Sequence, residues 1–282
     1  MAITIIPAHE ISLAQQADLF REAFVGYVGG PFSLEAASLT IFLRSQGIDL
    51  CYSRFARDAD GLCGFGYITR TGDVSRISGM GVIPRARRMG IARKLLLELV
   101  AEARGRGDRA MVLEAIEQNP AAVSLYRSEN FREIGRLLGW RRPSGPFSQE
   151  QNASAKPEII SPLVAGQQAP SLEFPELPWQ ISRHAIVRLA NPRAYSSAHA
   201  LVVFDDSGHE KPIRVSALLS PSHHQPDWSA LRGLLTNVLQ RFYSEREALA
   251  SPIFPEIFGE KIFAPLGFAQ EPLRQYLFRR DF

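Results

Sequence analysis

The sequence contains very little cysteine, with Cys51 and Cys63 the only two among 282 residues. Two cysteines provide no disulfide framework, and their spacing matches no metal-ligand pattern. A small secreted fold held together by disulfides is therefore excluded, and no metal site is expected. This cysteine usage favours a reducing, cytoplasmic compartment.

Long apolar runs and long runs of one charge are also missing. No segment approaches the roughly 18 consecutive apolar residues of a membrane span, and residues 1–7 have neither the charged leader nor the apolar core of a signal peptide. Lys and Arg are interspersed with Asp and Glu, and the net charge is +3. We therefore expect a protein that is neither exported nor inserted into a membrane, and that has no nucleic-acid partner.

What the sequence has is the composition of an ordinary folded protein, with 45% hydrophobic and 22% charged residues. Its length exceeds the usual size of one domain. Between residues 141 and 178 the composition shifts to Pro, Ser, Gln and Ala, which is typical of a linker. We expect a first domain at 1–141, a linker at 142–178 and a second domain at 179–282.

Hydrophobic spacing and turn signals predict α/β elements in both halves. Ser12 begins a capping box before a first helix, Ser33 is a candidate cap for a second, and Gly47 is placed to end that second helix. Asn119-Pro120 is a further helix start. The other expected elements are an antiparallel meander over 50–82, a helix at 90–104, strands at 109–117, 185–190, 199–204 and 213–219, and a helix at 228–243.

The most informative segment is residues 79–93, GMGVIPRARRMGIAR, which joins a predicted strand to a predicted helix. Backbone N–H groups at such a helix start point into one concavity, where the helix dipole adds partial positive charge. Small residues at Gly90 and Ala92 let an anion approach these amides, and Arg87, Arg88 and Arg93 add charge-assisted hydrogen bonds. The segment predicts a pyrophosphate site.

An Arg-rich turn before an amphipathic helix is also compatible with a plain solvated connector. The position between a strand and a helix favours a ligand site instead. The segment fits neither a Walker loop nor a GxGxxG fingerprint, so it indicates a nucleoside-phosphate ligand bound in another way.

Several motifs in a fixed order resemble the GNAT superfamily of N-acetyltransferases. They are Val82-x-Pro84-x-x-Arg87-x-x-Gly90-x-Ala92, then Leu113-Glu114, then Asn119-x-x-Ala122-x-x-x-Tyr126-x-x-x-x-Phe131. The resemblance covers about fifty residues closely and extends to Trp140 in its layout. One departure is Asn130, which stands where the family usually has Gly. The resemblance implies a mixed, mostly antiparallel sheet flanked by helices, with acetyl-CoA as co-substrate and no metal.

The resemblance also assigns the acetyl-CoA site by position. In this family, the strand before the loop diverges from its neighbour and binds the pantetheine arm with exposed main-chain groups, the loop holds the pyrophosphate, and an Asn contacts pantetheine. The corresponding residues here are Met80, Gly81, Val82, Arg87, Arg88, Met89, Gly90, Ile91, Ala92, Arg93 and Asn119. For Asn119, helix capping is an equally good interpretation, and one residue can do both.

Two residues match catalytic positions of the family. Tyr126 matches a phenol that lies near the thioester sulfur and protonates or orients the leaving thiolate; a half-buried core tyrosine is the alternative. Glu114 precedes Tyr126 by twelve residues, as does the catalytic base of members that acetylate ribosomal-protein N-termini. A carboxylate between apolar strand residues suits a base, whereas a structural acid, with a water chain as the base, is the other interpretation.

The resemblance implies that Phe24 and Tyr27 border the pocket for the acceptor. The expected partner is a primary amine of a small molecule or of a peptide, and a homodimer stays open. The expected activity is direct N-acetyl transfer from acetyl-CoA. A non-catalytic CoA-binding sensor or scaffold is the alternative.

Residues 263–268, FAPLGF, resemble the end of the same unit, so the second half is similar to a degenerate copy. Matching Phe268 to Phe131 places Phe263 at the tyrosine position, Glu256 at the asparagine and Ser251 at the glutamate. The acid and the base are then missing, and the preceding loop lacks the R-x-x-G-x-A spacing. We expect two tandem copies of the fold, with the second non-catalytic.

Overall fold

A computed structural model describes residues 2–29, 35–146, 157–169, 178–221 and 226–282. The chain divides into two compact units, each described by itself below. The first consists of residues 1–134 together with 276–282, and the second of residues 135–275. The candidate cap Ser33 lies outside the described residues.

The first unit follows the order of elements that the sequence predicts. Ser12 accepts a hydrogen bond from the Gln15 amide in a complete capping box, and Gly47 has a φ of 62° after the second helix. The elements are β1 (Thr4–Pro7), α1 (Leu13–Ala23), α2 (Ala36–Ser45), β2 (Ile48–Asp58), β3 (Gly61–Thr71), β4 (Val74–Val82), α3 (Ile91–Gly105), β5 (Ala110–Ile116), α4 (Pro120–Ser128) and the start of β6 (Arg132–Arg142).

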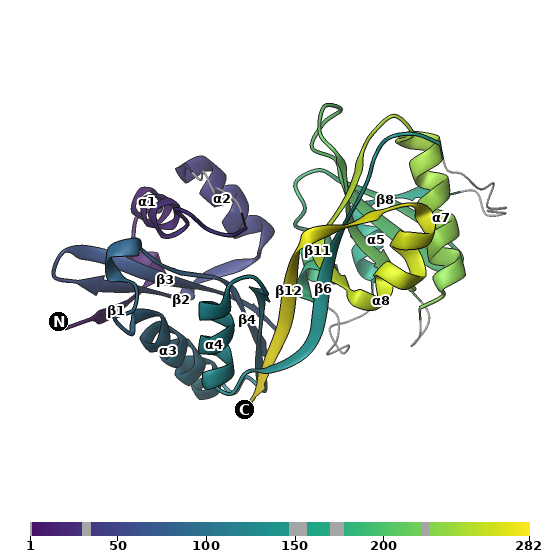
Figure 1. Ribbon diagram of the computed structural model, residues 1–282. Helices are drawn as coiled ribbons and strands as arrows, with labels where there is room; N and C mark the ends of the chain where they lie inside the picture. Colours follow the sequence, from purple (N-terminus) through teal and green to yellow (C-terminus); the bar gives the residue numbers. More distant parts are fainter. Residues whose placement is uncertain (1, 30–34, 147–156, 170–177, 222–225) are drawn as a thin grey trace. The chain divides into compact units, whose positions relative to one another are not determined.

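The sheet of this unit has the order β1-β2-β3-β4-β5, antiparallel except for the parallel pair β4 and β5. Helices α1 and α2 cover one face, and α3 and α4 cover the other (Figure 1). The apolar stripe of α3, with Leu95, Leu96 and Leu99 almost fully buried, packs on the sheet. This mixed sheet with helices on both faces confirms the predicted fold class.

Strands β4 and β5 pair over only part of their length. Their parallel register ends at Ile77 opposite Leu113, although β4 continues to Val82 and β5 to Ile116. On its other side β4 stays paired with β3 as far as Val82, with one extra residue, Ser78, forming a bulge. The two strands therefore separate and leave backbone edges unpaired between them.

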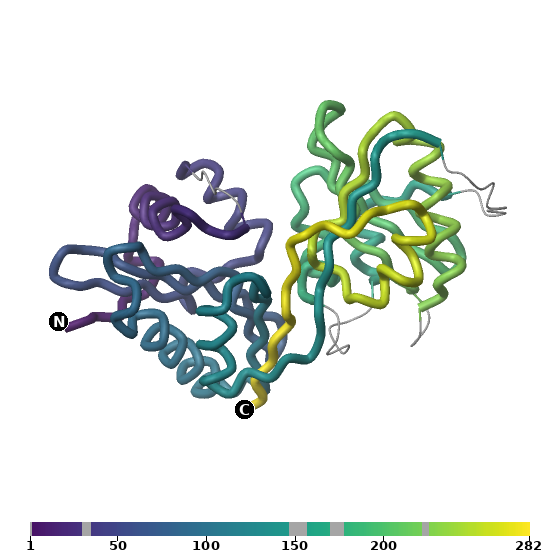
Figure 2. The backbone as a smooth tube through the Cα atoms, in the orientation of Figure 1, coloured from purple at the N-terminus to yellow at the C-terminus, as the bar shows by residue number. Residues whose placement is uncertain are grey.

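A strand from far along the chain completes the first unit. The end of β12 (Ala269–Asp281) lies next to β5 in the strand order, and residues 276–282 belong to the first unit (Figure 2). Phe278 is fully buried there, with its ring centroid 6.0 Å from that of Tyr126. The Arg280 guanidinium donates to the Glu129 carbonyl at 2.8 Å.

The second unit repeats the layout. Its strands follow the order β6-β11-β10-β9-β8-β7, and β10 and β11 form the parallel pair. The elements are β7 (Glu158–Ile160), α5 (Pro162–Gln168), α6 (Arg183–Ile186), β8 (Pro192–Ser197), β9 (Ala200–Asp205), β10 (Ile213–Leu219), α7 (Trp228–Phe242), β11 (Ala248–Pro255) and the short helical turns Glu256–Phe258, Gly259–Phe263 and Ala264–Leu266.

Two expectations for the second half need correction. Residues 158–168, which we expected within a linker, form β7 and α5, because Ser161 caps a helix that starts at Pro162. Residues 185–190 were expected as a strand, but Arg183–Ile186 form a helical turn instead. The apolar run at 185–190 is too short for its periodicity to distinguish a helix from a strand.

Candidate active site

The loop between β4 and α3 presents a row of unused hydrogen-bond donors. Within the described part of the chain, no acceptor lies against the backbone N–H groups of residues 88–93. The first amide of this helix start with a partner belongs to Lys94, which donates to the Gly90 carbonyl at 3.0 Å. Because the helix dipole adds positive potential at these amides, the loop is a ready anion site.

Gly90 makes this geometry accessible. It is the N-cap of α3 and has a φ of 79°, a left-handed conformation that an L side chain adopts only with strain. A Cβ added there would meet no heavy atom within 4 Å, so the residue borders open space. Arg88 also has a positive φ, 65°. Such a turn aims consecutive amides toward one point.

The three arginines expected to bind the pyrophosphate, Arg87 and Arg88 in the loop and Arg93 in α3, are used in different ways. Arg87 donates to the carbonyls of Val82 and Ala23, at 3.1 and 3.0 Å, and so joins the loop to β4 and α1. Arg93 forms a 2.6 Å ion pair with Glu129. Among the residues that the structure describes, Arg88 forms no ion pair or side-chain hydrogen bond, so its guanidinium is the one available to an anion.

A cavity of about 650 Å³ opens beside this loop. It brings together all the residues predicted for the site except Met89 and Glu114. Additional lining residues that sequence reasoning missed include Ala23, Gly26, Val28, Gln118 and Leu125. The predicted residues in its wall are Phe24, Tyr27, Met80, Gly81, Val82, Arg87, Arg88, Gly90, Ile91, Ala92, Arg93, Asn119 and Tyr126.

Packing also explains why residue 81 is a glycine. A Cβ at this position would lie 2.9 Å from the Phe65 ring and 3.0 Å from the Ala23 Cβ. A side chain at this position would therefore point into the core. The bulge itself is at Ser78, three residues earlier.

Asn119 is the N-cap of α4, as predicted. Its side-chain oxygen accepts from the Ala122 amide at 3.3 Å, and Pro120 occupies the first helical turn. The residue also lines the cavity. Both interpretations of Asn119 therefore fit this position.

Tyr126 lies where the cavity meets the hydrophobic core. Burial, and next the proximity of Tyr27 and Glu114, raises the pKa of its phenol above the ordinary value. Burial likewise raises the pKa of Tyr27. Both phenols therefore stay protonated at neutral pH, as a donor to a developing thiolate must.

Glu114 does not have the apolar surroundings that the strand pattern suggested. Its carboxylate accepts three hydrogen bonds from Arg76, from Nε at 3.1 and 2.9 Å and from Nη2 at 2.7 Å. The two side chains are 5% and 4% exposed. Arg76 was missed, although a charged residue inside a central strand signals a buried partner.

In the described part of the second unit, the residues at the equivalent positions do not form this arrangement. Its β10 has a bulge at Ser216, the equivalent of Ser78, so Leu218 and Leu219 stand at the positions of Met80 and Gly81 and are buried. At the start of α7, Asp227 accepts from the Ala230 amide at 2.9 Å. A carboxylate there repels a diphosphate and already uses one of the helix-start donors.

Aromatic side chains pack closely in the core of the second unit. Phe263, at the tyrosine position, is fully buried, and its ring stacks on Trp140 with centroids 5.9 Å apart. The Trp140 ring also presses on Gly259, where an added Cβ would overlap it.

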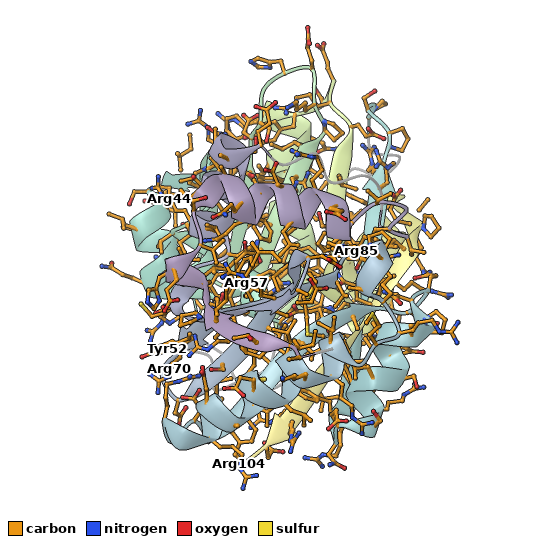
Figure 3. All side chains as sticks on the ribbon, turned by 90° about the vertical axis from the view of Figure 1, so that its left-hand side faces the viewer. Arg44, Tyr52, Arg57, Arg70, Arg85 and Arg104 are labelled. Atoms are coloured by element: carbon orange, nitrogen blue, oxygen red, sulfur yellow. The ribbon has the colours of Figure 1, made fainter. Side chains whose placement is uncertain are left out.

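A polar cluster around Asp108 in the first unit is structural. The buried Asp108 carboxylate accepts from Arg70 at 2.7 Å and Ser75 at 2.6 Å, with Arg106 at 3.2 Å. The ring of Tyr52 lies 4.2 Å from the Arg106 guanidinium carbon. Tyr52 and Arg70 lie beside each other in Figure 3. Although burial opposes ionisation of Asp108, the hydroxyl and the guanidinium groups outweigh it and lower its pKa.

Across the described ranges, no group of three or more His, Cys, Asp or Glu side chains is arranged to hold a metal ion. Over the same ranges, no helix combines the length and apolar character needed to cross a bilayer. Cys51 and Cys63 are both free thiols.

Comparisons with known proteins agree on one family for the first half. The model of the acetyltransferase (GNAT) family matches residues 17–131. N-alpha-acetyltransferase RimI of Mycobacterium tuberculosis is 36% identical over 94 residues, which are 32% of this chain and 58% of that protein. The matched segment thus spans little more than half of that relative.

Solved structures extend the likeness to the whole chain. A GCN5-related N-acetyltransferase from Anabaena variabilis superposes with a TM-score of 0.66 at 15% identity, covering 99% of this chain and 73% of that one. A tandem GNAT protein from the clavulanic acid biosynthesis pathway gives 0.61 at 14% identity, covering 99% and 98%. At such identities the likeness shows the fold, and it confirms the tandem arrangement.

Proposed function

Residues 17–131 form a domain of the acetyltransferase (GNAT) family, and from this premise we propose that the chain is an N-acetyltransferase that moves acetyl from acetyl-CoA directly to a primary amine. One observation carries the proposal: the row of backbone N–H groups at residues 88–93 borders the cavity and has no acceptor among the residues that the structure describes. A pyrophosphate is the anion that such a row at a helix start binds well. The cysteine usage supports a cytoplasmic location.

The separated strands β4 and β5 accommodate the rest of the co-substrate. Past Ile77, the edge of β4 facing β5 is unpaired, and Met80 and Val82 lie on the cavity wall. An arm that contains amides fits there like an additional strand, because its N–H and C=O groups can form hydrogen bonds with the unpaired backbone groups of β4. We expect the thioester of such an arm to lie near Tyr126.

The reaction requires two proton movements. The free amine attacks the thioester carbonyl carbon, so that the C–N bond forms while the C–S bond breaks and its electron pair passes to sulfur. One amine proton must leave, and the thiolate must be stabilised or protonated. The products are an amide and the free CoA thiol.

Tyr126 is our candidate for the thiolate side. Its raised pKa keeps the phenol protonated, and a thiol of ordinary pKa near 8.5 is more acidic than this phenol. A complete proton transfer from phenol to thiolate is therefore uphill. We assign Tyr126 a hydrogen bond to the developing thiolate, with solvent supplying the final proton.

Glu114 is our candidate for the amine side. It is the first residue of β5 beyond the last register pair with β4, and its charge is close enough to Tyr126 to raise the tyrosine pKa. Since it does not line the cavity and is 4% exposed, it receives the amine proton through an intervening water.

The acceptor is expected on the side of Phe24 and Tyr27. The RimI relative is an N-alpha-acetyltransferase by name, so a peptide α-amine is the first acceptor to test. We propose a non-catalytic role for the second unit, because Asp227, Leu219 and Phe263 stand where the first unit has its site.

The test is calorimetry followed by turnover. CoA should bind, and pantetheine, which carries the same thiol arm without the diphosphate, should bind at least tenfold more weakly. Thiol release from acetyl-CoA should then require an amine from a panel of peptides, amino acids, aminoglycosides and simple amines. Equal binding of CoA and pantetheine refutes the diphosphate site. Binding without turnover on the whole panel favours a CoA sensor instead.

A further inference from the structure

Arg76 belongs to an oriented polar network that ends on Glu114. Besides its bonds to that carboxylate, Arg76 donates from Nη1 to the Gln46 side-chain oxygen and to the Ser78 hydroxyl, both at 3.1 Å. The Thr69 hydroxyl donates to the Gln46 carbonyl at 2.6 Å and lies 2.5 Å from the Ser78 hydroxyl. Because the Thr69 hydroxyl proton is already donated to the Gln46 carbonyl, the Ser78 hydroxyl must be the donor in its bond with Thr69. The Ser78 oxygen in turn accepts from Arg76.

The ion pair spans the point at which the strands separate. Arg76 is opposite Val112 in the last stretch of β4–β5 pairing, and Glu114 follows the final register pair. Arg76 therefore reaches diagonally across the vertex of the split and fixes the carboxylate there. The network also ties Glu114 to the end of α2 through Gln46, the C-cap residue of that helix.

The second unit contains the same arginine without the acid. Arg214 is opposite Leu249, two residues before Ser251, just as Arg76 is opposite Val112, two residues before Glu114. It donates to the Ser251 hydroxyl at 2.9 Å and is exposed. Only in the unit with the cavity is the pair buried and charged.

Resting on the proposed function, we propose that Arg76 is a positioning residue that balances the charge of the buried Glu114 carboxylate and fixes it at the vertex of the split, where it accepts the amine proton. The groups recorded around the pair are the cation Arg76 on β4, the neutral Gln46 on α2 and the phenol of Tyr126 on α4, with Tyr27 next to Tyr126. Within the described chain, Arg76 is therefore the cation that ion-pairs with Glu114.

The experiment compares pH profiles of variants with that of the wild type. Acetyl-CoA and a short peptide with an unblocked N-terminus are the substrates, or the best amine of the panel. The ratio of variant to wild-type kcat/KM is plotted against pH, because the acceptor's own titration cancels in that ratio. In Arg76→Gln the ratio should fall as pH decreases, by roughly tenfold per unit over one to three units. In Arg214→Gln, the matched control, it should stay near one.

Arg76→Lys tests position separately from charge. It keeps the positive charge but loses the planar fork that binds both carboxylate oxygens. We expect turnover reduced at least tenfold at every pH, with CoA affinity by calorimetry unchanged. This variant also decides the matter if Arg76→Gln does not fold by circular dichroism. Wild-type turnover in Arg76→Lys overturns the positioning role.

The failures are distinguishable. A pH-independent ratio in Arg76→Gln, with an active wild type, overturns the role of Arg76 alone. A wild type that binds CoA but acetylates no amine of the panel overturns the proposed function, and this inference with it.

Discussion

Replacing Gly90 by Asp tests the helix-start anion site most directly, because Gly107 provides a matched control at the other end of α3. Both glycines have nearly the same left-handed φ, 79° and 80°, and at both an added Cβ meets nothing within 4 Å. The backbone strain of Gly→Asp, about 1–2 kcal/mol, is therefore shared. Only Gly90 borders the cavity.

Of the two variants, Gly90→Asp should have the higher stability and the lower affinity for CoA. At Gly90 the new carboxylate caps the helix and favours its dipole by about 0.3–1 kcal/mol, whereas at Gly107 the dipole acts against it. A charge about 5 Å from a phosphate costs about 1–3 kcal/mol at effective dielectric constants between water and protein surface. Gly90→Asp should thus be the more stable variant but bind CoA about 10- to 100-fold more weakly.

Calorimetry with CoA at low salt and thermal unfolding measure the two effects. The loss of affinity in Gly90→Asp should shrink as salt is raised, since the repulsion is partly screened. Wild-type affinity in Gly90→Asp, or an equal loss in Gly107→Asp, refutes an anion site at this helix start.

Three further predictions concern single residues. Tyr126→Phe should lower kcat by roughly 10- to 100-fold with unchanged CoA binding, measured by thiol release; unchanged kcat removes the tyrosine from the mechanism. Asp108 has a lowered pKa, so its stabilisation is present above about pH 3.9 and is lost as the pH falls through the folded-state value; urea titrations of Asp108→Asn should show lower stability at neutral pH and a weaker dependence on acid. Arg142→Ala should lower the free energy of unfolding in urea by about 2–4 kcal/mol, because the Arg142 guanidinium donates to the carbonyls of residues 143, 145, 146 and 266. The control Arg141→Ala, at a neighbouring surface position, should lower it by at most about 1 kcal/mol. Equal losses of stability in the two variants contradict this prediction.

Local signals predicted the parts of the site that are built locally. The capping roles of Ser12 and Asn119 depend on residues three positions away, and the left-handed Asn130, with a φ of 63°, follows from its place at a helix end. The anion loop is likewise contained in fifteen consecutive residues. Each of these features needs no knowledge of distant chain segments.

Contacts between distant segments were not predictable in this way. The Arg76–Glu114 pair joins residues 38 positions apart, and strand alternation gives the face of a residue but not its partner across the sheet. Phe278 reaches Tyr126 from the far end of β12, and no periodicity indicates which unit a strand will join. Composition alone marked residues 158–168 as linker, although a helix cap at Ser161 was present in the sequence.

The contribution of residues 276–282 to the first unit has a consequence for biosynthesis. The ribosome must translate all of residues 135–275 before it makes Phe278, which at about 5–20 residues per second takes roughly seven to thirty seconds. Until then the nascent first unit lacks the ring that packs against Tyr126, and the apolar surface that Phe278 covers stays exposed. A chain that ends within the second half therefore lacks the last strand of the first unit.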